Sequence, residues 1–134
     1  MALFKFKIDL NWVDVSAVTD MSCLFWNDWF KTFNCDISRW DVSRVTNMHC
    51  MFYKCSNFNK NIGNWDVHNV TDMADMFNGC KKFNQNLNNW DVSKVNTMSC
   101  MFYDCANFNS PLDKWNVSNA TQVYGMFNCC STFN

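Results

Sequence analysis

The nine cysteines are the side chains in this sequence best suited to chemistry, because thiols oxidise, exchange and bind soft metal ions. Four recur at 25-residue spacing within an apolar pattern, which predicts small buried core residues: Cys55, Cys80, Cys105 and Cys130. Three more form a column predicted to point outward: Cys23, Cys50 and Cys100. Exposed thiols favour a reducing compartment or bonds between neighbouring chains or coils. Because nine is odd, at least one cysteine lacks an intrachain partner.

A metal site is the second chemistry to consider, since His49 and Cys50 are adjacent and Cys55 follows them. Zinc sites commonly use closely spaced cysteine pairs, and the sequence holds no C-x-x-C motif. On a predicted helix, a separation of five residues places Cys50 and Cys55 on different faces. We therefore predict no metal site and no cofactor.

Catalysis by side chains is not indicated either. The two histidines, His49 and His68, are predicted to lie on solvated faces, so no Ser/His/Asp grouping can be argued. The three glycines fall singly and form no phosphate-binding loop. We predict that the protein is not an enzyme and has no catalytic residues.

Four aspartates at repeat spacing form a candidate acidic ladder: Asp14, Asp41, Asp66 and Asp91. Like charges stacked at strand spacing repel each other unless something compensates them. A cation site or a ligand-facing acidic stripe is one interpretation. The alternative is structural, with each carboxylate accepting a backbone N–H two residues on, in an Asx-type turn. Asn116 occupies the same column in the last copy, which favours the structural interpretation.

An internal repeat of the sequence determines where these candidate residues lie. Tryptophan recurs every 25 residues, each time followed by Asp or Asn and then Val: Trp40, Trp65, Trp90 and Trp115. A Phe-Asn column has the same spacing, and its asparagines are predicted to satisfy loop backbone groups between coils: Asn34, Asn59, Asn84, Asn109 and Asn134. A period of about 20–29 residues with registered apolar columns is typical of leucine-rich-repeat solenoids.

Within one copy the apolar spacing changes from two residues to that of a helix. Trp65 and Val67 alternate about Asp66, which predicts a short strand. The following residues, 70–80, place an apolar stripe on one face of a predicted helix, with Thr71 as its N-cap. A unit of this size cannot bury its stripe alone, so neighbouring coils must stack.

We therefore expect an α/β repeat: a right-handed leucine-rich-repeat-like solenoid of five coils, with short parallel strands on one face and short helices on the other. Residues 1–134 form a single repeat domain in this interpretation. An N-terminal cap strand covers residues 1–10, and coils of 25–27 residues run from about residue 6 to residue 134.

One copy of the repeat carries the motifs Asn64-Trp65-Asp66-Val67, Val70-Thr71-Asp72-Met73, Met76-Phe77, Cys80 and Phe83-Asn84. These motifs resemble the BspA-type leucine-rich repeat, in the variant described as a mycoplasma-type domain of unknown function. The resemblance covers residues 6–134. It implies a binding or structural surface, with adhesion the usual suggestion, and no catalytic residues. Related repeats occur in surface proteins of mycoplasmas and lactic acid bacteria and in large DNA viruses.

Composition excludes several classes of protein. The chain is 49% hydrophobic and 17% charged with a net charge of −1, so it lacks the basic surface of a nucleic-acid-binding protein. No apolar run approaches the ~18–20 residues of a membrane span. Residues 1–10 carry three charged side chains where a signal peptide has an apolar core. We expect a virion or intracellular location, with the cell surface or secretion as the alternative if the chain is a fragment.

The two ends of the repeat are the candidate interaction surfaces. The irregular first copy carries three tryptophans that form either a docking patch or an end cap: Trp12, Trp26 and Trp29. The last copy presents four side chains on a face that no polar capping repeat follows: Val117, Tyr124, Met126 and Phe127. We expect protein partners at these end coils, self-association among them, and neither nucleic-acid binding nor membrane insertion.

These observations predict a non-enzymatic structural or protein-interaction module within a larger assembly. The asparagine-rich composition, with abundant Phe and Lys, fits an AT-rich genome, which large DNA viruses and mycoplasmas share. The specific expectation is a minor structural (capsid) component of a large DNA virus. The alternative is an adhesion or host-binding repeat region of a bacterial cell-surface protein.

Overall fold

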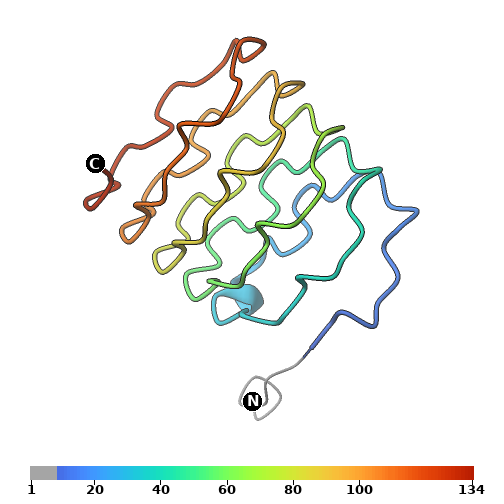
Figure 1. Cartoon of the computed structure of the whole chain (residues 1–134). Coiled ribbons are helices and arrows are strands. Elements are labelled where there is room, and N and C mark those ends of the chain that lie inside the picture. The colour runs from blue at the N-terminus through green and yellow to red at the C-terminus, as the bar shows by residue number, and fades with distance from the viewer. Residues whose placement is uncertain (1–8) are drawn as a thin grey trace.

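The computed structural model describes residues 9–134, and Figure 1 shows this part of the chain winding through successive turns that lie side by side. We call each turn a coil. Isolated parallel bridges join neighbouring coils: Asp9 with Asp36, Asp20 with Asn47, Asn47 with Asp72, Asp72 with Thr97, and Thr97 with Gln122. The last four bridges share residues and form one ladder across the coils. Each position of a copy therefore meets its counterpart in the next copy.

The predicted fold class is wrong. In residues 9–134 the single helix is the one-turn 3-10 helix η2 (Asp28–Phe30), and strand pairing is limited to the isolated bridges, so there is no sheet. The Asn27 side chain caps η2 by accepting the Trp29 N–H at 3.2 Å. The coils are thus not a right-handed α/β leucine-rich-repeat-like solenoid with strands on one face and helices on the other. The expected cap strand at 1–10 lies almost wholly outside the described residues.

The segment predicted as a helix, residues 70–80, is a series of turns with alternating backbone bonds. Every second N–H donates to a carbonyl of the next coil, at 2.8–3.0 Å: those of Met73, Asp75, Phe77 and Gly79. The N–H groups between them close turns onto the carbonyl three residues earlier: those of Met76, Asn78 and Cys80. Thr71 caps no helix, because its hydroxyl donates to the Thr46 carbonyl at 3.2 Å, as its N–H does at 2.8 Å. A helix would need these N–H groups for its own i to i−4 bonds.

Residues in the left-handed region separate these turns and stop any helix from propagating. One column, which we call the thiol column, has φ between 55° and 64°: Cys23, Cys50, Asp75, Cys100 and Gly125. A second column four residues later has φ between 53° and 77°: Lys54, Gly79, Asp104 and Cys129. Each regular coil therefore contains two left-handed residues, four positions apart.

Stacked aromatic rings form the core. Phe77 lies between its counterparts Phe52 and Phe102, with ring centroids 5.5 Å and 5.6 Å away and nearly parallel planes. A second column passes through Phe83, whose ring is 4.2 Å from that of Phe77 in the same coil. Each such pair contributes about 0.5–1.5 kcal/mol beyond its burial. Continuous ring stacks therefore hold the coils together in addition to the backbone hydrogen bonds between them.

Buried polar atoms tie neighbouring coils as well. The thiol of Cys80 donates to the Phe52 carbonyl at 3.0 Å, and Cys55 and Cys105 make the same bond to their own preceding coils. The prediction that these three cysteines belong to the core is confirmed, while Cys130 in the last coil is half-buried.

The asparagine column also joins coil to coil. The side-chain oxygen of each asparagine accepts the backbone N–H of its counterpart one coil later, at 2.8–3.1 Å: Asn34 to Asn59, Asn59 to Asn84, Asn84 to Asn109, and Asn109 to Asn134. The predicted role of these asparagines between coils is confirmed.

Candidate functional site

The last coil presents an apolar face whose counterparts are buried in the coils before it. Val123 occupies the column of Met98, and it is 50% exposed whereas Met98 is fully buried. Val117, Val123, Met126 and Phe127 line a groove of about 590 Å³ on this face. Of the predicted end-face residues, Val117 and Tyr124 are exposed, and Met126 and Phe127 are half-buried. The predicted set does not include Val123, and its buried counterparts in the earlier coils, such as Met98, are the signal that identifies it.

The same face carries open backbone positions. In earlier coils, the N–H groups in the columns of Val123, Gly125 and Phe127 donate to the next coil, as those of Met98 and Cys100 do at 2.8 Å and 2.9 Å. Within residues 9–134, the N–H groups of Val123, Gly125 and Phe127 and the carbonyl of Thr121 have no backbone partner. Unpaired backbone groups in strand-like register are a template for pairing with another chain.

The first coil presents the opposite half of this pattern. In later coils, the carbonyls at the positions equivalent to Asp20, Ser22 and Leu24 accept N–H groups from the preceding coil. The N–H at the position equivalent to Thr19 donates to a carbonyl of the preceding coil. Among the described residues, none of these four groups has a backbone partner in the first coil. The two ends of the coil stack are therefore complementary in hydrogen bonding.

The three predicted tryptophans of the first coil are all exposed, Trp12 to 80%. Trp26 lines a hollow of about 390 Å³ together with Asn27, Asp28, Tyr53 and Lys54. Trp29 lies within η2. Whether these tryptophans form a docking patch or an end cap stays a prediction.

The acidic ladder consists of Asx-type turns. The Oδ1 atom of each aspartate accepts the N–H two residues later, at 3.0–3.2 Å, in the order Asp14, Asp41, Asp66 and Asp91. Asn116 makes the same bond to Ser118 at 3.1 Å. Hydrogen bonds from the following serines hold the pKa values of the carboxyl groups of Asp14, Asp41 and Asp91 below the usual range. Each carboxylate thus already accepts a hydrogen bond within its own turn.

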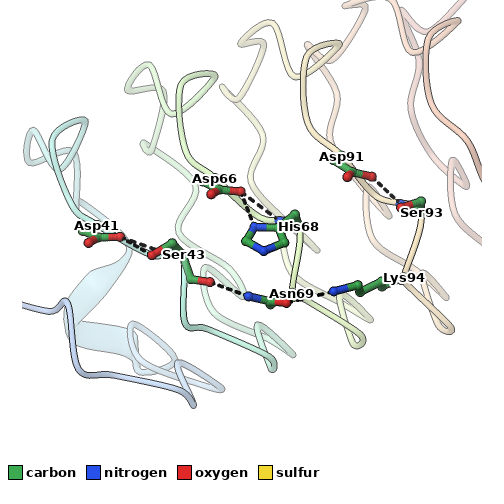
Figure 2. A network of polar contacts seen from close by, with 8 residues as sticks. All are labelled: Asp41, Ser43, Asp66, His68, Asn69, Asp91, Ser93 and Lys94. Carbon is green, nitrogen blue, oxygen red and sulfur yellow. Dashed lines mark hydrogen bonds and ion pairs between the residues drawn. The ribbon is translucent and has the colours of Figure 1, made fainter.

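Figure 2 shows how these turns connect on one side of the molecule. The Nδ1 atom of His68 lies 2.6 Å from Oδ1 of Asp66. The Asn69 amide donates to the Ser43 carbonyl of the preceding coil at 2.8 Å and accepts from Lys94 Nζ of the next coil at 3.0 Å. This surface network bridges three coils (Figure 2).

The predicted outward thiols differ in exposure. Cys23 is exposed, whereas Cys50 and Cys100 are half-buried, and all nine cysteines are free thiols. Burial, with the neighbouring Asp75 and other groups, raises the pKa of Cys50 to about 12, and burial also raises the pKa of Cys100. Because the thiolate is the nucleophile, these two residues are poor nucleophiles at neutral pH.

One cluster of potential metal-binding side chains was not predicted from the sequence. His49, Cys50 and Asp75 bring an imidazole, a thiol and a carboxylate together, with donor atoms all within 4.8 Å of one another. The sequence analysis paired His49 and Cys50 with Cys55, whose thiol instead donates to the Phe25 carbonyl in the core at 3.4 Å. The column shared by Cys50 and Asp75 at 25-residue spacing is the signal that identifies the third member.

The stacked coils of about 25 residues, with complementary open ends, define a repeat protein. Residues 9–134 contain no helix with the length and hydrophobicity of a membrane span. The chain belongs to the family described as "Mycoplasma protein of unknown function, DUF285", whose model matches residues 2–86 and 27–134. The prediction of a mycoplasma-type repeat family is confirmed. No curated protein and no solved structure matches the chain.

Proposed function

We propose that the chain is a non-enzymatic structural and protein-interaction module that joins a larger assembly through its end coils. The observation that carries the proposal is the open face of the last coil, where Val123 is half exposed while its counterpart Met98 is fully buried by the next coil. Apolar surface of this kind, together with unpaired backbone N–H groups, is typical of a protein-binding site.

The partner that fits this face is the first coil of a second copy of the chain. Continuing the register between coils places the N–H groups of Val123, Gly125 and Phe127 opposite the carbonyls of Asp20, Ser22 and Leu24. The same register places the Thr19 N–H opposite the Thr121 carbonyl. The new interface continues the contact that already joins each pair of coils within the chain. Leu24, 43% exposed, supplies apolar surface on the first coil.

Such an interface is heterologous, because two different faces meet. A heterologous contact extends into a filament or closes into a ring, and it does not stop at a dimer. A module of this kind suits a repetitive assembly such as a virus particle. We propose specifically a minor capsid component of a large DNA virus, in a virion or intracellular location, with a repeat related in sequence to the BspA-type family.

Sedimentation velocity over a range of protein concentrations tests the proposal. The wild-type chain is expected to form species larger than a dimer as concentration rises. Val123→Lys places a charge on the open face and is expected to weaken association about tenfold or more, because burying an unpaired charge is costly. Asn64→Lys introduces the same charge at an exposed position of an inner coil and is expected to associate as the wild type does.

A mixing experiment separates head-to-tail contact from other modes. Leu24→Lys blocks the first coil and Val123→Lys blocks the last coil, so each variant alone is expected to stay monomeric. Mixed together, the two variants are expected to form a dimer and nothing larger, because one open end of each remains. A wild-type chain that is monomeric at high concentration, or that forms only a symmetric dimer, would overturn the proposal.

A further inference from the structure

The mixed cluster of His49, Cys50 and Asp75 lies between two inner coils, on residues that take no part in the proposed end contacts. The Nε2 atom of His49 is 3.3 Å from the Sγ atom of Cys50. A carboxylate oxygen of Asp75 completes a group whose donor atoms all lie within 4.8 Å of one another. All three side chains are half-buried, so the cluster is open to ions from solvent on one side.

The backbone holds two of these donors in fixed positions. Cys50 and Asp75 are neighbours in the thiol column, with φ of 55° and 57°. The coils that carry them are joined by the Met48 N–H to the Asp72 carbonyl at 2.9 Å and by the Cys50 N–H to the Ala74 carbonyl at 3.0 Å. A site built on hydrogen-bonded backbone loses little conformational freedom when a ligand binds.

A second carboxylate lies near the imidazole. The Nδ1 atom of His49 is buried, has no hydrogen-bond partner, and lies 3.9 Å from Oδ1 of Asp72. A carboxylate on this side favours the tautomer with the proton on Nδ1, which leaves the Nε2 lone pair facing Cys50. Histidines that bind metal ions usually have their other ring nitrogen next to such a carboxylate or carbonyl.

The negative groups of the cluster are not neutralised by the protein. Asp75 Oδ1 accepts the Asn78 amide at 2.7 Å, and in residues 9–134 no basic side chain forms an ion pair with Asp75. The Cys50 thiol and the Asp75 carboxylate belong to the same cluster of donor atoms. A bound cation would neutralise the Asp75 carboxylate and the Cys50 thiolate at once.

We propose that His49, Cys50 and Asp75 bind a divalent transition-metal ion of the zinc class, with water as the fourth ligand. Sulfur, imidazole nitrogen and carboxylate oxygen are the donors that Zn²⁺ uses in proteins, whereas Ca²⁺ and Mg²⁺ require oxygen donors. Tetrahedral coordination with Zn–S of about 2.3 Å and Zn–N of about 2.0 Å separates sulfur and nitrogen by roughly 3.5 Å. The observed 3.3 Å is close to that separation. Binding releases the thiol proton of Cys50 to solvent.

Titration of the reduced full-length chain with Co²⁺ tests this site, because a cobalt–thiolate bond gives a charge-transfer absorption band that other ligands do not. The wild type is expected to bind one Co²⁺ with this band and to release it when Zn²⁺ is added. Cys50→Ser is expected to abolish the band. His49→Ser and Asp75→Asn are expected to weaken binding about tenfold or more, and Asp72→Asn by about 10- to 100-fold. Serine is already present in the His49 column at Ser22 and Ser99.

Cys100→Ser is the matched control. Cys100 lies in the same column with the same φ of 55°, but Ser99 precedes it where His49 precedes Cys50. This variant is expected to bind Co²⁺ as the wild type does. The proposal fails if the wild type shows no thiolate band, if Cys50→Ser keeps the band, or if Cys100→Ser loses it. None of these outcomes bears on the end-to-end association.

A second measurement uses the wild-type chain alone and does not depend on whether the variants fold. Zn²⁺ is expected to slow alkylation of Cys50, read by peptide mass mapping, while the exposed Cys129 is alkylated at an unchanged rate. Equal rates at Cys50 with and without Zn²⁺ would contradict the proposal.

Discussion

The indole N–H of Trp65 donates to the carbonyl oxygen of Ile37, 3.1 Å away in the preceding coil. Trp40, Trp90 and Trp115 make the same bond to their own preceding coils at 2.9–3.0 Å. Ile37 is fully buried and Trp65 nearly so, hence neither polar group has access to water. One side-chain atom in each of these coils therefore ties it to the coil before.

Replacing Trp65 with phenylalanine tests the strength of this tie. Trp65→Phe leaves the Ile37 carbonyl buried without its donor, which is expected to lower the free energy of unfolding by about 1–3 kcal/mol. Urea unfolding followed by near-ultraviolet circular dichroism measures the loss. Trp29→Phe changes an exposed indole without such a bond and is expected to stay within about 0.5 kcal/mol of the wild type. Equal losses in the two variants would contradict the assigned role of the bond.

The sequence columns predicted which residues share a position in each coil, because a repeat places equivalent side chains in equivalent environments. Phe77, Phe83 and Trp65 are core residues for this reason. The local backbone could not be predicted in the same way. Residues 70–80 have apolar side chains three and four residues apart, and both a helix and a series of turns accommodate that spacing. The left-handed conformation of Asp75 and Cys50 distinguishes the two, and cysteine gives no sequence signal for it.

Of the candidate sites, one could be predicted from the sequence columns and one could not. The exposed end face was predictable because Val117 continues a column that is buried in the earlier coils and lacks a covering coil of its own. The cluster of His49, Cys50 and Asp75 was not, because its members come from adjacent coils and approach one another only through coil stacking. Nearness in sequence suggested Cys55 as the third ligand instead, and Cys55 lies in the core.

The Asx-type turn at Asp41 predicts a specific dependence on pH. Hydrogen bonds from Ser43 lower the pKa of the Asp41 carboxyl from 3.8 in the folded chain, so this group stabilises the fold above its unfolded pKa and stops doing so as pH falls through its folded pKa. Asp41→Ala is therefore expected to lower the Tm at pH 7, with a difference from the wild type that shrinks below pH 3.8.

The variant Asp41→Asn separates the contribution of charge from that of turn geometry. An asparagine oxygen can accept the same N–H, as Asn116 does from Ser118 at 3.1 Å. We expect its Tm at pH 7 to lie much closer to that of the wild type than that of Asp41→Ala does. An Asp41→Asn chain as unstable as Asp41→Ala at pH 7 would show that charge, and not turn geometry, is what the column requires.

Gly79 tests the left-handed columns. Its φ is 77°, and a Cβ added there would lie 3.3 Å from the Lys54 Cα and 3.2 Å from the Lys54 Cγ. Gly79→Val is expected to destabilise the chain by about 1–2 kcal/mol or more, since a β-branched residue tolerates this conformation poorly. Gly79→Asn is expected to lose clearly less, because asparagine enters the left-handed region more readily. Urea midpoints of the two variants give the comparison, and equal midpoints would mean that crowding by Lys54 outweighs backbone conformation.

The burial of the thiols predicts the order in which they react. In a reduced, metal-free chain at pH 8, Cys23 and Cys129 are expected to be alkylated first because both are exposed. Cys50 is expected to follow slowly, since burial raises its pKa to about 12 and little of the thiol is ionised at that pH. Cys55, Cys80 and Cys105 are buried and are expected to react only at the rate at which the chain unfolds. Time-resolved peptide mass mapping gives each rate, and a Cys80 that reacted as fast as Cys129 would contradict the packing of the core. Adding urea below the unfolding midpoint should then accelerate the three buried thiols together, because they belong to one stack of coils.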